Sequence, residues 1–593
     1  MNSFWHYLFQ KTSIASLLPS VVAFPIMLVL GSNLPVEAQS LPPDASPRPN
    51  IPPFTPIEPT QPESPQLKPL PPLEDLLEQP PATPPGQQPG DLSGTVEVKQ
   101  FQIEGSTVFD EEELQELIKQ YTNRPITFAE LLQVETILTR FYNSQGYINS
   151  GAVVPQQDIQ DGVIKVQIIE GRLEDIAVKV NGRLSEEYVR SRVARGGKTP
   201  LNINKLQESL QLLQLDPLVE NLTAELSVGA RRDRWNLEVE VNQAPAFKPE
   251  LFVNNSRTPS VGSFQRGIAL NHNNFAGEGD RASFVYKNTD GSDDYEAGYT
   301  VPINSLNGTV GFRYRFVESE IVEPPFDELD IDSETDQYQL TFRQPILLTA
   351  NADSTQELAV GVELSRQANK TTLLNDPFPL SVGANDDGET TVSAVRFFQD
   401  WTRRTRREVL AARSQFSVGL DLFDSTINEN APDSKFFAWR GQAQWLRQLD
   451  AESNINLLLR SDLQLSTSQL VPLEQFSLGG AESARGYRQD ALLGDSGIFA
   501  SAEVRIPVLR WNENTSSVAV IPFLDFGTTW NKSDDNNQQD EDTLFSLGLG
   551  LQLSLSDRLN ARLDWGIPLV EVEDQDRTLQ EDGIYFSLEY LPF

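Results

Sequence analysis

The sequence predicts a multidomain membrane protein in which two small α+β modules precede a sixteen-stranded antiparallel transmembrane β-barrel. Two observations support this fold class. From Ala246 to Phe593 the chain alternates apolar and polar residues in segments of about ten residues, the pattern of strands in a membrane barrel. Residues 96–245 instead carry a pattern of helices and strands that repeats after about 75 residues. A chain of 593 residues is long enough for several domains.

The first 38 residues have the features of a removable export signal. A short start containing Lys11 is followed by the apolar run Ile14–Leu30 and by small residues around Ala38 that suit cleavage. Pro19 and Pro25 interrupt the run, which argues against the alternative of an uncleaved membrane helix. No later run approaches the roughly 20 apolar residues that a spanning helix needs, so a membrane crossing must use strands.

Residues 39–95 are predicted to form a disordered linker. Eighteen of the forty prolines lie between Pro42 and Pro89, mixed with Gln, Glu and Ser, and this composition cannot bury enough apolar surface to fold. The run Leu73–Glu78 is the exception, because its pattern suits one or two amphipathic helical turns. We interpret this run as a transient helix within a tether.

The repeat predicts two modules, residues 96–171 and 172–245, each with the element order strand, helix, helix, strand, strand. The opening strands end at Gly105 and Gly182. The second helix of each copy follows a suitable N-cap residue, Thr127 in the first copy and Asn202 in the second. Two alternating segments close each copy and predict paired strands: Tyr147–Val154 with Val163–Ile169, and Leu222–Val228 with Trp235–Val241.

The lengths of the connections in residues 246–593 predict the orientation of the barrel. Sixteen alternating segments fit the even strand count of bacterial barrels. If the first strand runs outward, the odd-numbered connections face outside; these are mostly long, as in Ser466–Gly497, whereas the even-numbered ones are short, as in Ser556–Arg558. Acidic residues gather in the long connections at 327–336, 534–542 and 574–582. We interpret them as solvated loop tips, with calcium binding as the alternative.

Composition excludes several classes of function. The chain has no cysteine, and its two histidines, His6 and His272, leave little for a zinc site or a Ser-His pair, so we predict no enzyme activity, metal or cofactor. A net charge of -37 disfavours nucleic acid as a partner. The run Gly196–Thr199 lacks the first glycine of a phosphate-binding loop, because Arg192 stands there. Any transport by this chain must therefore proceed without local nucleotide hydrolysis.

The most specific motif is FSLGGAESARGY, Phe476–Tyr487, inside the longest connection. Its glycines Gly479 and Gly480 frame Arg485, which Gly486 and Tyr487 follow. The connection is long enough to fold into the barrel lumen.

A second motif lies about forty positions further on, in the alternating strand Val518–Trp530. The strand presents an apolar face made of Val520, Pro522, Leu524 and Phe526. Because side chains alternate along a strand, its other face is expected to point into the lumen. That inward face carries Phe523, Asp525 and Gly527.

The export signal, the two modules, the sixteen strands and these two motifs together resemble two-partner secretion transporters of the ShlB/FhaC/HecB haemolysin secretion and activation type. The resemblance covers nearly the whole chain after the linker. It implies POTRA modules in the periplasm and a pore in the bacterial outer membrane. The implied function is export of a large, mostly β-helical exoprotein in extended form, with its activation as an open option. Client segments would add to strand edges of the modules, and folding outside would bias passage without ATP.

The same resemblance implies that Arg485 and Asp525 form a charged pair that locks the connection inside the lumen. Gly486, Tyr487, Phe523 and Gly527 would complete this lock, with Gly479 and Gly480 framing the loop. The alternative is a surface-loop arginine and a separate lumen carboxylate.

The end of the chain implies further partners. The final amphipathic strand stops at Phe593 and resembles the signal by which bacterial barrels are recognised for assembly, although Pro592 shifts the usual spacing by one residue. The expected partners are therefore the unfolded client, outer-membrane lipid and the barrel assembly machinery. Relatives with a plug helix carry it before the first module, where this chain has mainly a proline-rich tether.

Two rival functions stay open at this point. An outer-membrane protein insertase or a protein-import pore of the same superfamily typically carries more than two modules. A passive porin or surface receptor needs no modules and so leaves residues 96–245 unexplained.

Overall fold

The computed structural model describes residues 77–78 and 95–592, apart from 160, 232, 430–431, 513–514, 533–540, 557 and 573–577. The predicted export signal, most of the predicted linker and Phe593 lie outside the described residues. None of the helices found in the described part has the length and apolar character needed to cross a membrane.

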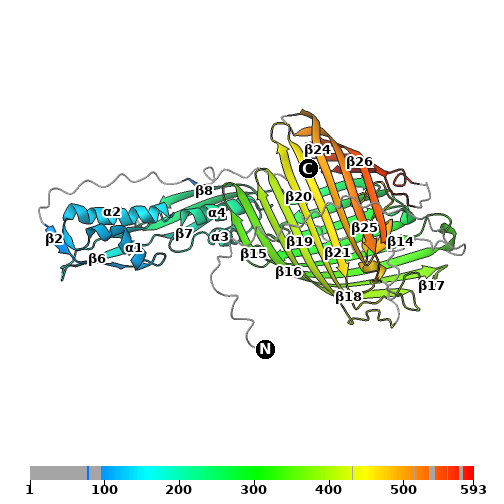
Figure 1. The fold of residues 1–593 in the computed structure, drawn as a ribbon, viewed down its shortest axis with the longest axis horizontal. Helices are drawn as coiled ribbons and strands as arrows, with labels where there is room; N and C mark the ends of the chain where they lie inside the picture. The colour runs from blue at the N-terminus through cyan, green and yellow to red at the C-terminus, as the bar shows by residue number, and fades with distance from the viewer. Residues whose placement is uncertain are drawn as a thin grey trace, which may run out of the picture. The chain divides into compact units, whose positions relative to one another are not determined.

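The first module packs two helices on a three-stranded sheet (Figure 1). Strand β3 pairs in parallel with β6, and β5 pairs with β6 in antiparallel. Thr127 caps the second helix through a reciprocal hydrogen-bond pair with Glu130, as its position in the sequence predicted. The elements are β2 (Thr95–Val98), β3 (Gln100–Glu104), α1 (Glu111–Ile118), β4 (Arg124–Thr127), α2 (Phe128–Ser144), β5 (Gly151–Val153) and β6 (Val163–Ile169).

One predicted strand of this module is mostly not a strand. The sequence predicted Tyr147–Val154, but only Gly151–Val153 pairs. The Tyr147 ring instead packs near the rings of Phe109 and Tyr142, with centroids 5.8 and 6.0 Å away. Aromatic packing at the end of α2 therefore overrides the alternating pattern in the first half of this segment.

The second module repeats the predicted element order. Strand β7 pairs in parallel with β9, and β8 pairs with β9 in antiparallel. The side chain of Asn202 accepts hydrogen bonds from the first turn of the second helix, which confirms it as the N-cap. The elements are β7 (Arg172–Asn181), α3 (Glu186–Val193), α4 (Ile203–Gln214), β8 (Val219–Val228) and β9 (Arg234–Gln243).

The linker run Leu73–Glu78 does not form the predicted helical turn where the structure describes it. Leu77 and Glu78 form a two-residue strand, β1, which pairs in parallel with β8. Leu77 is only 4% exposed and belongs to the core of the second module. Burial of an apolar side chain at a sheet edge has outweighed the helical pattern, and residues 73–76 lie outside the described residues.

The described residues from 247 onward form a closed antiparallel barrel of sixteen long strands plus the short β17 (Asp376–Pro377), as predicted. These strands carry the green to red colours of Figure 1. Outward positions hold exposed apolar side chains such as Phe312, Leu340 and Leu549. The strands are β10 (Phe247–Asn254), β11 (Gln265–Asn273), β12 (Arg281–Asn288), β13 (Ser292–Pro302), β14 (Thr309–Glu320), β15 (Ile331–Ala350), β16 (Ser354–Leu373), β18 (Glu389–Thr405), β19 (Glu408–Leu420), β20 (Phe437–Asp450), β21 (Ile455–Ser466), β24 (Ser496–Trp511), β25 (Ser516–Trp530), β26 (Glu541–Leu555), β27 (Leu559–Pro568) and β28 (Ile584–Tyr590).

The connections follow the predicted alternation of length. Every even-numbered connection has between two and seven residues, as in 274–280, 303–308 and 351–353. The odd-numbered ones are longer, except for 289–291, and the longest runs from 467 to 495. The barrel thus has one end of short turns and one end of long loops.

The second module contacts the barrel at the end with short turns. The Ser185 backbone N–H donates to the Gly277 carbonyl at 2.8 Å, Arg192 Nε donates to Asn307 Oδ1 at 3.0 Å, and Gln211 Nε2 donates to the Asn351 carbonyl at 3.0 Å. Each acceptor lies in a different even-numbered connection. The module is therefore fastened to three neighbouring turns.

Tyr188 forms the centre of this attachment. The Arg192 guanidinium stacks 3.3 Å from the centre of the Tyr188 ring, and the phenol donates to Asp216 Oδ2 at 2.7 Å. Gly279 of the first contacted turn leaves room for the ring, since an added Cβ would lie 2.3 Å from Tyr188 Cε2. Burial raises the pKa of the Tyr188 phenol above its ordinary value, as does the neighbouring Asp216 carboxylate. The phenol therefore stays protonated at neutral pH and keeps its hydrogen bond.

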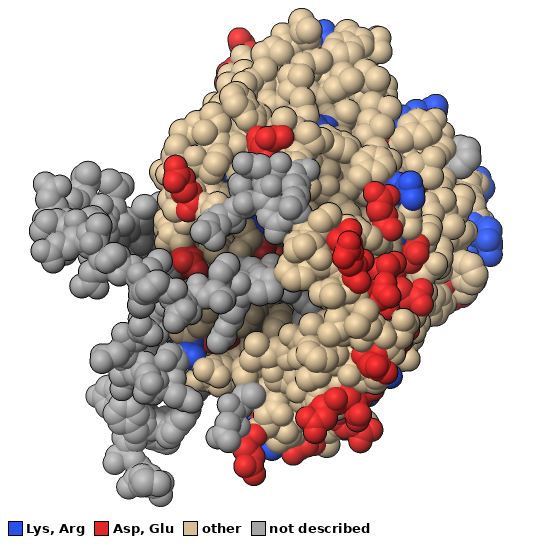
Figure 2. All heavy atoms as spheres, turned by 90° about the vertical axis from the view of Figure 1, so that its right-hand side faces the viewer, with Lys and Arg blue, Asp and Glu red and all other residues tan. Residues whose placement is uncertain are grey.

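Figure 2 shows the face on which β17 lies, with acidic side chains grouped on it. Part of this charge comes from exposed residues of β14, β15 and their connection: Glu318, Glu320, Asp327, Glu328, Asp330 and Glu334. The predicted acidic segments 534–542 and 574–582 lie partly outside the described residues.

The connection lengths predict which loops antibodies can reach on intact cells. An epitope inserted between Asp386 and Asp387, in the connection after β17, should be labelled from outside. The same epitope inserted between Arg406 and Arg407, in a two-residue turn at the other end, should be labelled only after the outer membrane is permeabilised. Equal labelling of the two insertions on intact cells would contradict this orientation.

Candidate functional site

The candidate site is built on the connection 467–495 between β21 and β24. Within it, β22 (Phe476–Leu478) and β23 (Leu492–Gly494) pair as a small hairpin. Phe476, Leu478 and Tyr487 of this connection are buried in one apolar cluster with Phe499 of β24 and Leu544 of β26. The connection therefore packs against the inner side of the barrel wall, as its length allowed.

The glycines of the first motif give the connection its path. Gly479, Gly480 and Gly486 have φ of 110°, 103° and 102°, a region that residues with a Cβ rarely adopt. At Gly480 an added Cβ would also lie 2.0 Å from Gln489 Oε1. These glycines let the chain fold back on itself on both sides of Arg485.

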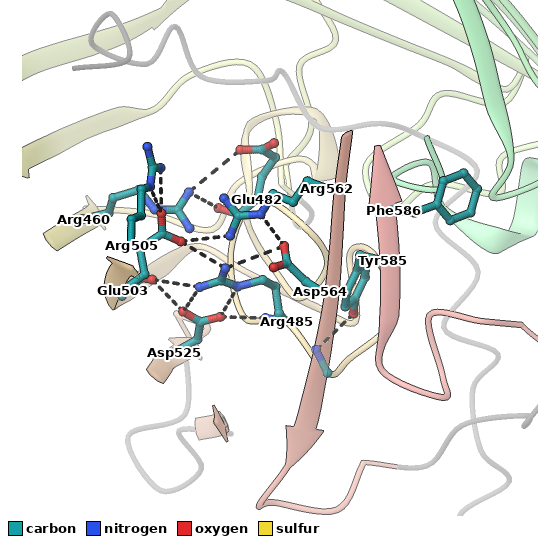
Figure 3. A network of polar contacts seen from close by, with 12 residues as sticks. Arg460, Glu482, Arg485, Glu503, Arg505, Asp525, Arg562, Asp564, Tyr585 and Phe586 are labelled. Carbon is teal, nitrogen blue, oxygen red and sulfur yellow. Dashed lines mark hydrogen bonds and ion pairs between the residues drawn. The ribbon is translucent and has the colours of Figure 1, made fainter. Parts of the chain in front are cut away.

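Arg485 and Asp525 meet in the two-point geometry typical of a guanidinium and a carboxylate (Figure 3). Arg485 Nε donates to Asp525 Oδ2 at 2.7 Å and Nη2 donates to Oδ1 at 2.9 Å. The Arg485 backbone N–H also donates to Oδ2 at 3.2 Å. The two residues are 1% and 0% exposed, so water does not screen their attraction.

Further charged residues, which no sequence pattern had singled out, surround this pair. Arg485 Nη1 donates to Glu503 at 3.2 Å and lies 3.8 Å from an Asp564 oxygen. Glu503 also accepts from Arg505 at 2.7 Å and from Arg562 at 3.0 Å. Figure 3 shows the carboxylates and guanidinium groups of this cluster interleaved.

Strand alternation alone could have marked these residues as inward-facing. Glu503 and Arg505 are two apart on β24, and Arg562 and Asp564 are two apart on β27. Alternation does not tell which inward residues meet, because that depends on the register of strands far apart in the sequence.

The other residues of the second motif contact the connection directly. The Phe523 ring lies under the guanidinium, 3.5 Å from its centre to the Arg485 Cζ atom. Gly527 makes room for Leu478, since an added Cβ would lie 2.5 Å from Leu478 Cδ1. Leu524 and Phe526 are 45% and 40% exposed on the opposite face. On one face of β25 the motif thus supplies a carboxylate that pairs with Arg485, an aromatic ring that covers the guanidinium, and a position without a side chain where Leu478 packs.

Tyr487 and Gly486 fix the connection to the last strands. The Tyr487 phenol donates to the Phe545 carbonyl at 2.8 Å, and the oxygen accepts from the Val570 backbone N–H at 3.2 Å. The Tyr585 hydroxyl accepts from the Gly486 N–H at 3.2 Å and donates to the Tyr487 carbonyl. Beneath them, Gly566 of β27 lets the backbone of the connection approach closely.

Further ion pairs hold the connection outside the motif. Arg396 of β18 contacts Glu474 at 2.5 Å and lies 3.7 Å from Glu363, and its side chain is 5% exposed. Arg488 donates to Glu323 of the β14–β15 connection at 2.8 Å. The connection is therefore anchored on both sides of Arg485 and to strands on different parts of the barrel wall.

The burial of these charged side chains determines how much each contact contributes to the free energy of the folded state. A single charge left without its partner in a buried site costs about 3–5 kcal/mol, whereas an exposed pair contributes about 0–1 kcal/mol. Arg485, Glu503 and Asp525 are each at most 2% exposed, so they belong to the first case. The described residues contain no group of three His, Cys, Asp or Glu side chains that is arranged to hold a metal ion.

Adding a single methyl group tests the close approach at Gly566. In Gly566→Ala the new Cβ would lie 2.6 Å from the Gly486 backbone nitrogen, so the connection has to move. We expect higher conductance in planar bilayers and faster proteolysis within residues 467–495. In the control Gly311→Ala the nearest atom is Thr300 Oγ1 at 3.0 Å, on a side chain that can rotate. Conductance and proteolysis of Gly566→Ala equal to those of Gly311→Ala would contradict the packing described.

The chain is similar to known proteins in family profile, in sequence and in structure. The sequence profile of the family described as haemolysin secretion/activation protein ShlB/FhaC/HecB matches residues 235–553. The profile of the ShlB-type POTRA domain matches residues 96–171.

Relatives of known name are similar over most of their length. The heme/hemopexin transporter protein HuxB of Haemophilus influenzae strain 86-028NP is 22% identical over 481 residues, which cover 75% of this chain and 78% of HuxB. The outer membrane transporter CdiB of Dickeya dadantii is 22% identical over 470 residues, which cover 76% of this chain and 78% of CdiB.

A solved structure shares the fold. That of CdiB from Escherichia coli superposes with a TM-score of 0.64 at 20% identity, over 86% of this chain and 93% of CdiB. The profile matches more than half of the chain, and the barrel, the modules and the charged site in the lumen are present together. The chain belongs to the ShlB/FhaC/HecB haemolysin secretion/activation family, the outer-membrane transporters of two-partner secretion, whose POTRA modules lie in the periplasm.

Proposed function

We propose that this transporter exports one large exoprotein in extended form and that the buried Arg485–Asp525 pair locks the pore when no client is present. The observation that carries this proposal is the position of the pair. It joins the connection 467–495 to β25 inside the lumen, with neither residue more than 1% exposed. A connection anchored in this way reduces the space for a passing chain, so export requires that it moves.

The motif residues have separate roles in this lock. Asp525 holds the guanidinium, Phe523 supports its face, and Gly527 admits Leu478. Gly486 and Tyr487 attach the same turn to β26, β27 and the Tyr585 hydroxyl. Gly479 and Gly480 set the turn that presents Arg485.

The modules capture the client by strand addition. The outer edge of β5 in the first module has no strand paired to it among the described residues, and Val153 there is 43% exposed. An extended segment can satisfy this edge with main-chain hydrogen bonds without adopting a fold. That mode suits a client that must stay unfolded until it has crossed the membrane.

The driving force of export comes from the client. The chain carries no complete nucleotide-binding motif, and folding of the client outside buries apolar surface that is solvated during passage. We infer transport without local ATP hydrolysis, and no catalytic step on the part of this chain.

The last described strand of the barrel serves assembly rather than export. The last described strand, β28, is amphipathic and pairs with β10 to close the barrel. We propose that the barrel assembly machinery binds this strand and that the outward apolar side chains contact lipid.

A double-mutant cycle tests the lock. Arg485→Ala and Asp525→Ala should each lower export at least tenfold, because each leaves the remaining charge buried without its main partner. The double variant should be no worse than either single variant, and Arg485→Lys should recover only part of the export, because an ammonium cannot make the two-point contact. Secreted client is measured in the medium and transporter in the outer membrane.

The pair Arg315 and Asp294 provides a matched control. It joins β14 to β13 with the same two-point geometry, at 3.0 and 2.7 Å, and neither residue belongs to the connection. Arg315→Ala should leave most of the export intact. Equal loss in Arg315→Ala, or additive losses in the Arg485 and Asp525 cycle, would overturn the lock.

Removing the modules tests the export mechanism. A chain without residues 96–245 should still give a heat-modifiable barrel in the outer membrane, because the closed sheet begins at β10. It should export no client, and the polypeptide that accumulates in the periplasm identifies the client. Normal export without the modules would contradict the proposal that the client docks on them.

A further inference from the structure

The edge of β8 in the second module already holds an extended segment of the same chain. Leu77 is the register partner of Ala224, and Glu78 that of Glu225, in parallel. Leu77 is 4% exposed and belongs to the apolar cluster that forms the core of the module. A linker residue thus contributes to the core of a domain that begins about a hundred positions later.

The sequence of β8 explains why a leucine fits there. Leu222, Ala224 and Leu226 face the core and are each at most 4% exposed, whereas Thr223 and Glu225 face outward. The smallest of the three core-facing side chains stands opposite Leu77. The edge therefore offers main-chain hydrogen bonds and, at one position, space for a leucine-sized side chain.

The held segment is short compared with the strands around it. It shares two residue pairs with β8, whereas β9 shares nine with the other edge of β8. Parallel pairing is also slightly less stable per residue than antiparallel pairing. A contact of this size can exchange while the sheet of the module stays intact.

The first module provides an internal comparison. Its strand β5 has the same place in the repeat as β8, between the second helix and the last strand. No described strand pairs with the outer edge of β5. The two repeats therefore present one free edge and one occupied edge.

We propose that the β8 edge is a binding site for an extended peptide with a leucine-sized apolar residue opposite Ala224, and that Leu77–Glu78 is its resting occupant. An extended client segment replaces this occupant, a step that rests on the proposed function. Residues 79–94 connect the occupant to the first module, so the displaced segment stays attached and can return once the client has left.

A peptide-binding measurement on the full-length protein tests the site. The probe is a fluorescent synthetic peptide with the sequence of residues 71–80, PPLEDLLEQP. Purified Leu77→Asp protein, whose own segment can no longer fill the apolar position, should bind this peptide at least tenfold more tightly than the wild type does. A peptide with aspartate at the position of Leu77 should not bind. Equal affinity of the wild type and Leu77→Asp for the peptide would overturn the site.

A disulfide lock tests whether exchange is needed. The natural chain has no cysteine, so Leu77→Cys with Ala224→Cys can form only one bridge, and neighbouring paired strands lie about 4.8 Å apart, within disulfide reach. When oxidised, this variant should lose peptide binding, and reductant should restore it. Lys179→Cys with Glu240→Cys bridges the paired strands β7 and β9 and leaves the β8 edge unchanged, so it is the matched control.

Export by the two locked variants distinguishes a failure of the replacement step at β8 from a failure of the proposed export function. We expect the oxidised Leu77–Ala224 variant to export at least fivefold less client than the oxidised control. Normal export by the locked variant would overturn the replacement step, even if the deletion of residues 96–245 abolishes export as the proposed function requires. Peptide binding to the oxidised lock as tight as to the reduced form would overturn the site itself.

Discussion

The burial of one guanidinium determines the arrangement of the lumen. Arg485 is 1% exposed, and a charge at such a position is tolerated only if carboxylates and hydrogen-bond acceptors surround it. Asp525 supplies two oxygens, Glu503 a third, and the Phe523 ring covers the remaining face. Glu503 in turn is neutralised by Arg505 and Arg562. Inward-facing residues of β24, β25 and β27 thus surround Arg485, a charged side chain that belongs to the connection and to none of these strands.

The same connection depends on the absence of side chains elsewhere. Gly527 and Gly566 lie on the barrel wall where Leu478 and the Gly486 backbone approach, and an added Cβ at either would overlap the connection. Charged contacts give the connection its orientation, whereas the wall glycines allow the distance at which those contacts form. The charged contacts form only because the wall glycines let the connection approach, since hydrogen bonds weaken steeply with distance and angle.

Sequence patterns predicted those structural features that depend on the spacing of apolar residues and on contacts between residues close in sequence. Alternation predicted the sixteen strands and the inward side of β25, and capping residues predicted the starts of α2 and α4. Long-range packing was not predictable in the same way. Tyr147 joined an aromatic cluster instead of a strand, and Leu77 joined a sheet edge instead of a helix. Glu503 and Arg562 were missed because their meeting depends on strand register, and a local pattern carries no information about it.

The connection and its main anchors also lie close together along the chain. Arg485 is 18 positions from Glu503 and 40 from Asp525, so the contacts among them close short loops, which costs less entropy than joining distant strands. The closing pair β10–β28, by contrast, joins the two ends of the barrel. Arg485 can therefore find its partners before the barrel closes. A barrel assembled in this order already has the connection fastened to its inner wall when β10 and β28 pair, so the connection takes its place while one side of the sheet is still open.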